Sequence, residues 1–172
     1  IDAGNFVDEN LALDVFLPKT GDRGRILADT ASIGLLGILG CAVLRWGDFG
    51  IAFQGAFVQD GPALFFKILF LVAGLFVFHM VREYEPALRR APAEFIVLIL
   101  FALEGMSFLA SANEFLLFFV SLETLTISLY VITAYLRDDE RSTEAGAKFL
   151  ILGTLATALF VYGLSFIFGS TG

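Results

Sequence analysis

Two acidic residues lie inside strongly apolar stretches of this 172-residue sequence, Glu123 within FVSLETLTIS and Glu104 within FALEGMSF. A carboxylate at the centre of a membrane helix costs about 2.5–3.5 kcal/mol on insertion scales, and such residues usually mark ion or proton pathways. Glu123 lies about ten residues from the polar turn at Asn113, or about 15 Å along a helix, too deep for its short side chain to reach the surface. We interpret Glu123 as a proton-exchanging group, and a carboxyl kept neutral by a hydrogen bond is the alternative.

Polar neighbours of Glu123 could assist such an exchange. Thr126 and Tyr130 share its helical face and could hold a water molecule or a hydrogen bond. Glu104 precedes the same turn by about eight residues, so a helical hairpin would place it about 12 Å deep, close to the height of Glu123. If the two carboxyls faced each other, they could not both ionise at low cost. Glu104 is therefore either a relay or a tolerated carboxyl that is protonated or faces a cavity.

Three basic residues lie near the ends of apolar stretches. Lys148 could move protons, or its long stem could reach the cytoplasmic surface and pair with Glu144 one turn earlier. Lys67 is expected to extend to the outer surface in the same way. A possible relay role is the alternative for Lys67, and also for Glu144. His79 is expected at the inner surface, where it could also pass protons near neutral pH.

The elements that carry these residues are predicted from composition. The sequence is 58% hydrophobic and only 17% charged, whereas soluble proteins average about 25% charged. The apolar residues gather into blocks of about 20, the length that crosses a bilayer as a helix. We predict an all-α, polytopic membrane helix bundle at residues 26–172, preceded at 1–25 by the end of an earlier helix and a cytoplasmic loop. The five expected helices cover residues 26–46, 62–81, 93–111, 114–136 and 145–168. Both ends of the sequence are expected to continue into a longer protein.

The positive charges predict the orientation of these helices. Eight basic residues fall on one side of the predicted membrane, and only Arg45 falls on the other. The eight are Lys19, Arg23, Arg25, Arg82, Arg89, Arg90, Arg137 and Arg141. Because cytoplasmic loops carry the excess of Lys and Arg, the first of the five helices should run outward from the cytoplasm. Its glycines at 34, 37 and 40 predict a close helix contact.

Several classes of function are excluded by composition. Cys41 is the single cysteine and His79 the single histidine, which excludes an internal disulfide, a CxxC redox pair and a thiolate metal site within these residues. We find no phosphate-binding glycine loop, dinucleotide fingerprint or HExxH string.

The segment from FLASANEF onward resembles the antiporter-like membrane subunits of respiratory complex I, and subunit N of the proton-pumping NADH:quinone oxidoreductase in particular. The marks are SANE, then LETLTISLYV, RSTEAGAKFLILG, YG and the final GSTG. Upstream, LDVFLP and VQDGPALFFKILFLVAGL are similar to the start of the same subunit. The likeness covers residues 11–172, corresponding to the end of the first helix through the sixth of some fourteen.

The resemblance implies roles for individual residues. Glu123 matches the fifth-helix glutamate, a central proton-path residue, and Lys148 matches the sixth-helix lysine. Lys67 matches a position that is commonly Lys and has no clear role. Glu104 departs from the usual small or apolar residue, so no family role is carried onto it, and the polar residues 1–10 depart from the apolar first helix. In the family, the lysine partner of the fifth-helix glutamate lies on a later, broken helix.

The predicted function is proton translocation as a subunit of an NADH:quinone oxidoreductase, coupled to quinone reduction elsewhere in the complex. We expect a translocase subunit with no redox chemistry or cofactor in this chain. Its expected partners are other membrane subunits of complex I, lipid and protons, with no nucleic acid. We place it in the bacterial inner membrane as a multi-pass protein, with a thylakoid or other energy-transducing membrane as the alternative. A Mrp-type cation/proton antiporter subunit, a photosynthetic plastoquinone-reducing homologue and a non-catalytic membrane scaffold remain alternatives.

Overall fold

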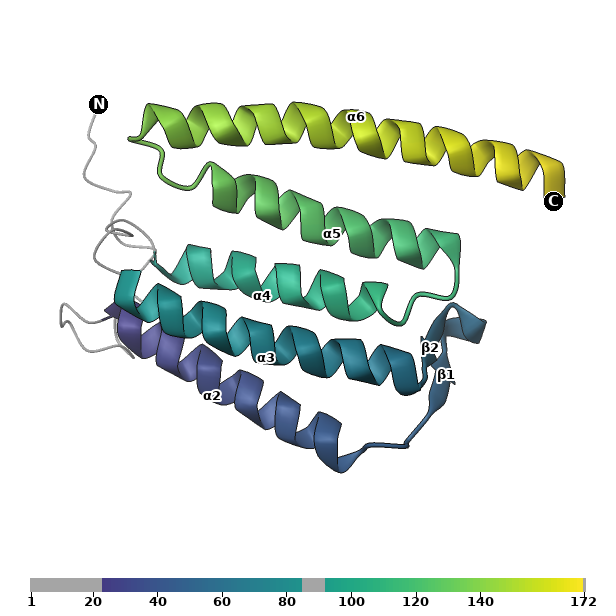
Figure 1. The fold of residues 1–172 in the computed structure, drawn as a ribbon, viewed down its shortest axis with the longest axis horizontal. Helices are drawn as coiled ribbons and strands as arrows, with labels where there is room; N and C mark the ends of the chain where they lie inside the picture. The colour runs from purple at the N-terminus through teal and green to yellow at the C-terminus, as the bar shows by residue number, and fades with distance from the viewer. Residues whose placement is uncertain (1–22, 85–91, 172) are drawn as a thin grey trace, which may run out of the picture.

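The chain forms a bundle of antiparallel helices in the computed structural model, which describes residues 23–84 and 92–171. Its helices are α2 (Arg23–Leu44), α3 (Gly61–Tyr84), α4 (Pro92–Leu109), α5 (Phe115–Thr133) and α6 (Glu140–Thr171). Each helix contacts the next one in chain order, and together they form a row from α2 to α6 (Figure 1). Residues 1–22 of the predicted segment 1–25 lie outside the described residues, as do residues 85–91 between α3 and α4, whereas residues 23–25 begin α2 and do not belong to a loop.

All five described helices are long and apolar enough to cross a membrane. The prediction of an all-α polytopic membrane bundle is confirmed. The helix ends differ from the expected ones by one to five residues, most clearly around the loop before α6. There Asp139 accepts the backbone N–H of Arg141 through Oδ1 at 3.0 Å and starts α6 at Glu140 rather than 145. α5 ends at Thr133, where the Ser142 hydroxyl donates to its carbonyl at 2.8 Å.

The hydrophobic core lies between α2, α3 and α4, where large aliphatic and aromatic side chains interlock. Phe78 of α3 is fully buried at its centre. The other core members are Ala28, Leu35, Leu71, Val81, Ile96, Ile99 and Leu103. α6 lies outside this core and contributes a single buried residue, Gly146.

A β-hairpin joins α2 to α3, in the glycine-rich connection between the expected helices 26–46 and 62–81. Strand β1 (Gly50–Ala52) pairs antiparallel with β2 (Phe57–Gln59), and the short helix η2 (Phe53–Gly55) connects them. The hairpin binds the turn between α4 and α5: Val58 N–H donates to Ser111 O at 2.9 Å, and the Asn113 side chain donates to Gly55 O at 2.9 Å. The hairpin therefore links the first half of the bundle to the second.

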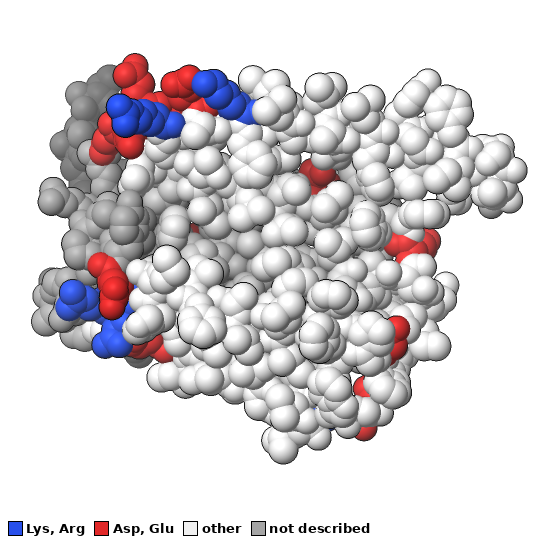
Figure 2. Space-filling view, viewed as in Figure 1, with Lys and Arg blue, Asp and Glu red and all other residues white. Residues whose placement is uncertain are grey.

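Basic side chains gather at the end of the bundle opposite the hairpin (Figure 2). We call this the basic end, and it is defined by Arg25, Arg82, Arg137 and Arg141. Arg82 of α3 pairs with Asp29 of α2 at 3.4 Å between Nε and Oδ1. This asymmetry agrees with the orientation predicted from the sequence, although Lys19, Arg89 and Arg90 lie outside the described residues.

Within the described residues, the glycines of α2 do not make the helix contact predicted from their spacing. A Cβ added at Gly34, Gly37 or Gly40 would meet no described atom within 4 Å. α2 instead packs on α3 and α4 through the face that carries Ala28 and Leu35, because apolar side chains there fill the core.

Candidate functional site

The rotation of α5 is fixed by a close contact with α4. A Cβ at Gly105 would lie 2.8 Å from Leu125 N and 3.0 Å from Ser121 O, so only glycine allows this approach. Ser121 and Ser128 are buried on the same side of α5. Glu123 is two residues from Ser121, a rotation of about 200° at 3.6 residues per turn. Its side chain therefore leaves α5 on the face directed toward α6.

The Glu123 carboxyl is half-buried and has a partner on α6. The Thr157 hydroxyl donates a hydrogen bond to Glu123 Oε1 at 2.8 Å. Such a hydrogen bond contributes about 0.5–1.5 kcal/mol to a neutral carboxyl and about 1.5–3 kcal/mol to a charged one. The carboxyl is thus held at mid-helix by a group that the sequence analysis did not select.

Aromatic contacts flank the Glu123–Thr157 pair along the α5–α6 interface. On the hairpin side, the rings of Phe118 and Phe160 lie 5.7 Å apart. On the side of the basic end, the buried Tyr130 packs edge to face on Phe149 at 4.9 Å. The phenol of Tyr130 also lies against Gly153, one turn of α6 from Thr157. Tyr130 is therefore next to the site, as its helical position predicts.

Thr126 is close to Glu123 in sequence but does not reach its carboxyl. Its hydroxyl donates to the backbone carbonyl of Glu123 at 3.3 Å. Thr126 and Glu123 therefore lie on the same side of α5, as expected. The carboxyl of Glu123, however, accepts its hydrogen bond from Thr157 of α6 and not from a residue of α5.

Glu104 is exposed on α4 and does not face Glu123. Its neighbour Gly105 contacts α5 beside Ser121 and Leu125, which agrees with the expected similar depth of the two carboxyls. Glu123 leaves α5 on the far side, however, so α5 itself stands between them. Within the described residues, Glu104 makes no hydrogen bond or ion pair.

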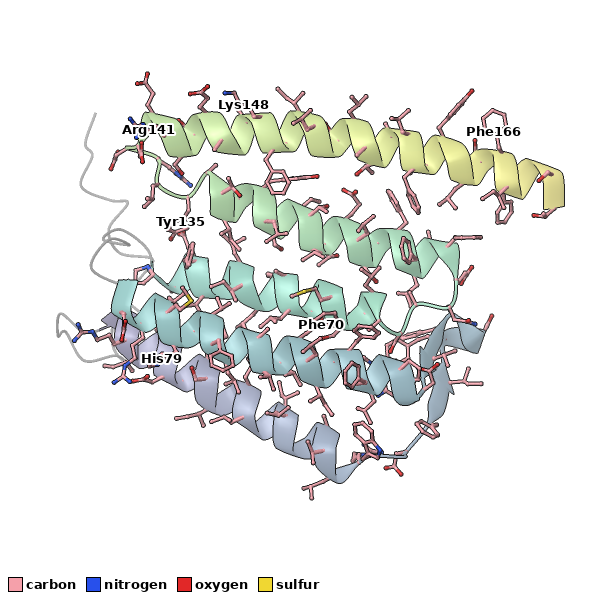
Figure 3. All side chains as sticks on the ribbon, viewed as in Figure 1. Phe70, His79, Tyr135, Arg141, Lys148 and Phe166 are labelled. Atoms are coloured by element: carbon pink, nitrogen blue, oxygen red, sulfur yellow. The ribbon has the colours of Figure 1, made fainter. Side chains whose placement is uncertain are left out.

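Lys148 and Glu144 form an exposed ion pair on α6, in which Lys148 Nζ donates to Glu144 Oε1. Their side chains are 68% and 62% exposed. Lys148 is nine residues from Thr157, which is about 13 Å along the axis and half a turn around it. Lys148 therefore points away from α5, and Figure 3 shows it on the outer side of α6.

Lys67 and His79 lie at opposite ends of α3. Lys67 is half-buried, donates to Gln59 Oε1 of the hairpin and stands 4.5 Å from the centre of the Phe57 ring. Its amino group therefore contacts two residues of the hairpin and does not extend freely to the surface. His79 is exposed near the basic end (Figure 3), as expected of an interfacial histidine.

A pocket of about 430 Å³ lies between α4, α5 and α6 near the basic end. Glu94, Tyr135 and Arg137 line it, and Tyr130 also contributes to its wall. Burial raises the pKa of Tyr135, just beyond the end of α5, and the charge of Glu94 adds to this increase. The pocket therefore connects charged groups at the basic end with the phenol beside the Glu123–Thr157 pair. Among the described residues, no three His, Cys, Asp or Glu side chains are grouped as a metal site would require.

Comparison with known proteins shows a similarity over the last two helices. Residues 112–172 match the family described as "NADH:quinone oxidoreductase/Mrp antiporter, TM". This match covers α5 and α6 and includes both Glu123 and Thr157.

The particular resemblance predicted from the sequence, to subunit N, is also confirmed. The chain is 38% identical over 156 residues to NADH-quinone oxidoreductase subunit N 2 of Rhizobium meliloti, covering 91% of this chain and 32% of that protein. It is 38% identical to subunit N of Heliobacterium modesticaldum, covering 91% of this chain and 33% of that protein. It is likewise 38% identical to NAD(P)H-quinone oxidoreductase subunit 2 of Picosynechococcus, covering 83% of this chain and 27% of that protein. The chain thus spans about a third of the length of the curated relatives it matches.

Proposed function

We propose that this chain is part of a subunit N-like membrane subunit of an NADH:quinone oxidoreductase and that it moves protons across the membrane. The observation that carries the proposal is a mid-helix carboxyl, Glu123, held by a hydroxyl of the neighbouring helix. A carboxyl at this depth can gain and lose a proton where few other groups can. The similarity to subunit N supplies the class of complex in which this would occur.

In this mechanism a proton enters from the basic end and reaches Glu123 along the α5–α6 interface. The pocket beside Tyr130 supports this direction, because it links charged groups at the surface to the neighbourhood of the carboxyl. Lys148 is included in this mechanism because it matches the sixth-helix lysine of the family that the chain resembles. The chain would supply no redox group, and electron transfer to quinone would occur elsewhere in the complex.

The partners in this proposal are the other membrane subunits of the complex, the lipid bilayer and protons. We place the protein in a bacterial inner membrane. The relative named NAD(P)H-quinone oxidoreductase subunit 2 supports a photosynthetic homologue as a second candidate, and the family description supports a Mrp-type antiporter subunit. Electron-donor specificity separates these candidates: the first proposal requires proton transport driven by NADH oxidation.

The direct test is Glu123→Gln in the full-length subunit within its assembled complex. Glutamine keeps the size and polarity of the side chain but cannot exchange a proton. We expect fewer protons translocated per NADH oxidised, with the amount of assembled complex unchanged. A non-catalytic scaffold predicts the same proton yield in the variant and the parent, and that result would refute the proposal.

A further inference from the structure

Thr157 uses its hydroxyl differently from the other threonines and serines of the described helices. Most of these hydroxyls donate to a backbone carbonyl three or four residues earlier in the same helix; Thr154, one turn away, donates to Leu150 O at 2.9 Å. Thr157 instead donates across the interface to the Glu123 carboxyl at 2.8 Å. Among the described serines and threonines, it alone donates to a carboxylate. The bond therefore reflects the placement of two helices and is not a routine local contact.

We propose that Thr157 is a positioning residue for proton exchange at Glu123, an inference that rests on the proposed function. Its hydrogen bond holds Oε1 against α6 and fixes the rotation of the carboxyl. Within the described residues Oε2 accepts no hydrogen bond, so this oxygen is the one presented for accepting and releasing the proton. A hydrogen bond of this kind restricts the geometry of the carboxyl as well as contributing energy.

The position of Thr157 also couples the carboxyl to the packing of α6. One turn away, Gly153 lies against the Tyr130 phenol, and three residues on, Phe160 packs on Phe118. These contacts fix the height of α6 relative to α5 and so bring the hydroxyl level with the carboxyl. A movement of α6 along its axis would break the bond and release Glu123 from its fixed orientation.

Two substitutions at Thr157 distinguish the effect of the hydroxyl from the effect of the side chain's shape. Thr157→Val keeps the branched shape and removes the donor, whereas Thr157→Ser keeps the donor and removes a methyl group. Thr154→Val is the matched control, since it removes an exposed hydroxyl of the same helix that bonds only to backbone. Thr157→Ala repeats the loss of the donor with a smaller side chain if the valine variant does not assemble.

The experiment measures protons translocated per NADH oxidised by the full-length complex in native membrane vesicles, together with the rate of NADH oxidation and the amount of assembled complex. We expect Thr157→Val to lower the proton yield toward that of Glu123→Gln, and Thr157→Ser to restore it. Thr154→Val should leave the yield unchanged. Thr157→Val should cause no further loss in a Glu123→Gln background, because it acts through that carboxyl.

The outcomes separate this inference from the proposed function. If Glu123→Gln lowers the proton yield and Thr157→Val does not, the positioning role is refuted and the proposed function stands. Equal losses in the valine and serine variants would also refute it, since packing and not the hydroxyl would then be responsible. A normal yield in Glu123→Gln would refute the proposed function itself.

Discussion

The phenol of Tyr130 on α5 occupies the space beside Gly153 of α6 into which any other residue would project its Cβ. This contact lies between the basic-end pocket and the Glu123–Thr157 pair. It allows a large polar ring to pack within the interface while the two helices remain close.

Gly153→Ala should therefore displace Tyr130 and separate α6 from α5. Overpacking of this kind typically costs about 1–3 kcal/mol, and the Thr157 hydroxyl one turn away would move from Glu123. We expect less assembled complex, a lower temperature of thermal inactivation and a reduced proton yield per NADH. Gly163→Ala is the control on the same helix, because a Cβ there meets no described atom within 4 Å. Equal behaviour of the two alanine variants would contradict the close contact.

The exposed pair of Lys148 and Glu144 should contribute little to stability. Ion pairs four residues apart on a helix surface contribute about 0.3–0.5 kcal/mol, so Glu144→Gln should leave the amount of assembled complex unchanged. If the charge of Lys148 regulates Glu123, Lys148→Met should lower the proton yield and Lys148→Arg should preserve it. Measurement of NADH-driven proton uptake by vesicles checks both variants. A normal yield with methionine would remove Lys148 from the mechanism.

Lys67 is predicted to stabilise the hairpin and not to carry protons. Its amino group contacts both Gln59 and the Phe57 ring, and Ser111 donates to the same Gln59 oxygen at 3.4 Å. Lys67→Met should leave the Gln59 side chain without its charged donor and make residues 50–59 more susceptible to limited proteolysis. The proton yield of the complex that does assemble should stay at the parental value. A lower yield with an intact hairpin would instead place Lys67 in the proton path.

Much of the fold could be predicted from the sequence, because apolar blocks of bilayer length and one-sided basic loops report directly on membrane helices. Helix ends were harder to predict. The start of α6 depends on the side chain of Asp139, which lies between the expected helices 114–136 and 145–168. The hairpin was missed because glycines in a connection indicate a turn without revealing that two short strands will pair. The glycines of α2 led to the opposite error. Their regular spacing predicted a helix contact, but α2 packs through a different face.

The site was predicted in part, because depth can be counted along a helix but rotation about its axis cannot. Counting therefore placed Glu104 and Glu123 at similar heights, whereas the Gly105 contact shows that they do not face each other. Thr157 was not predicted as a site residue, because a threonine within an apolar helix is common. Counting equal distances outward from the loop at residues 137–139 reaches residues 151–155, where Thr154 is the polar residue, so the count would have missed Thr157 by one turn of α6.

The central claim is that Glu123 exchanges protons and that depth in the membrane alone does not confer this role. Comparing Glu123→Gln with Glu104→Gln tests it most directly, since both replace a carboxyl at similar depth on adjacent helices. The measurement is the number of protons translocated per electron transferred from NADH to quinone in vesicles with equal amounts of assembled complex. This account predicts a lower ratio for Glu123→Gln and the parental ratio for Glu104→Gln. A parental ratio for Glu123→Gln, or a loss confined to Glu104→Gln, would contradict it.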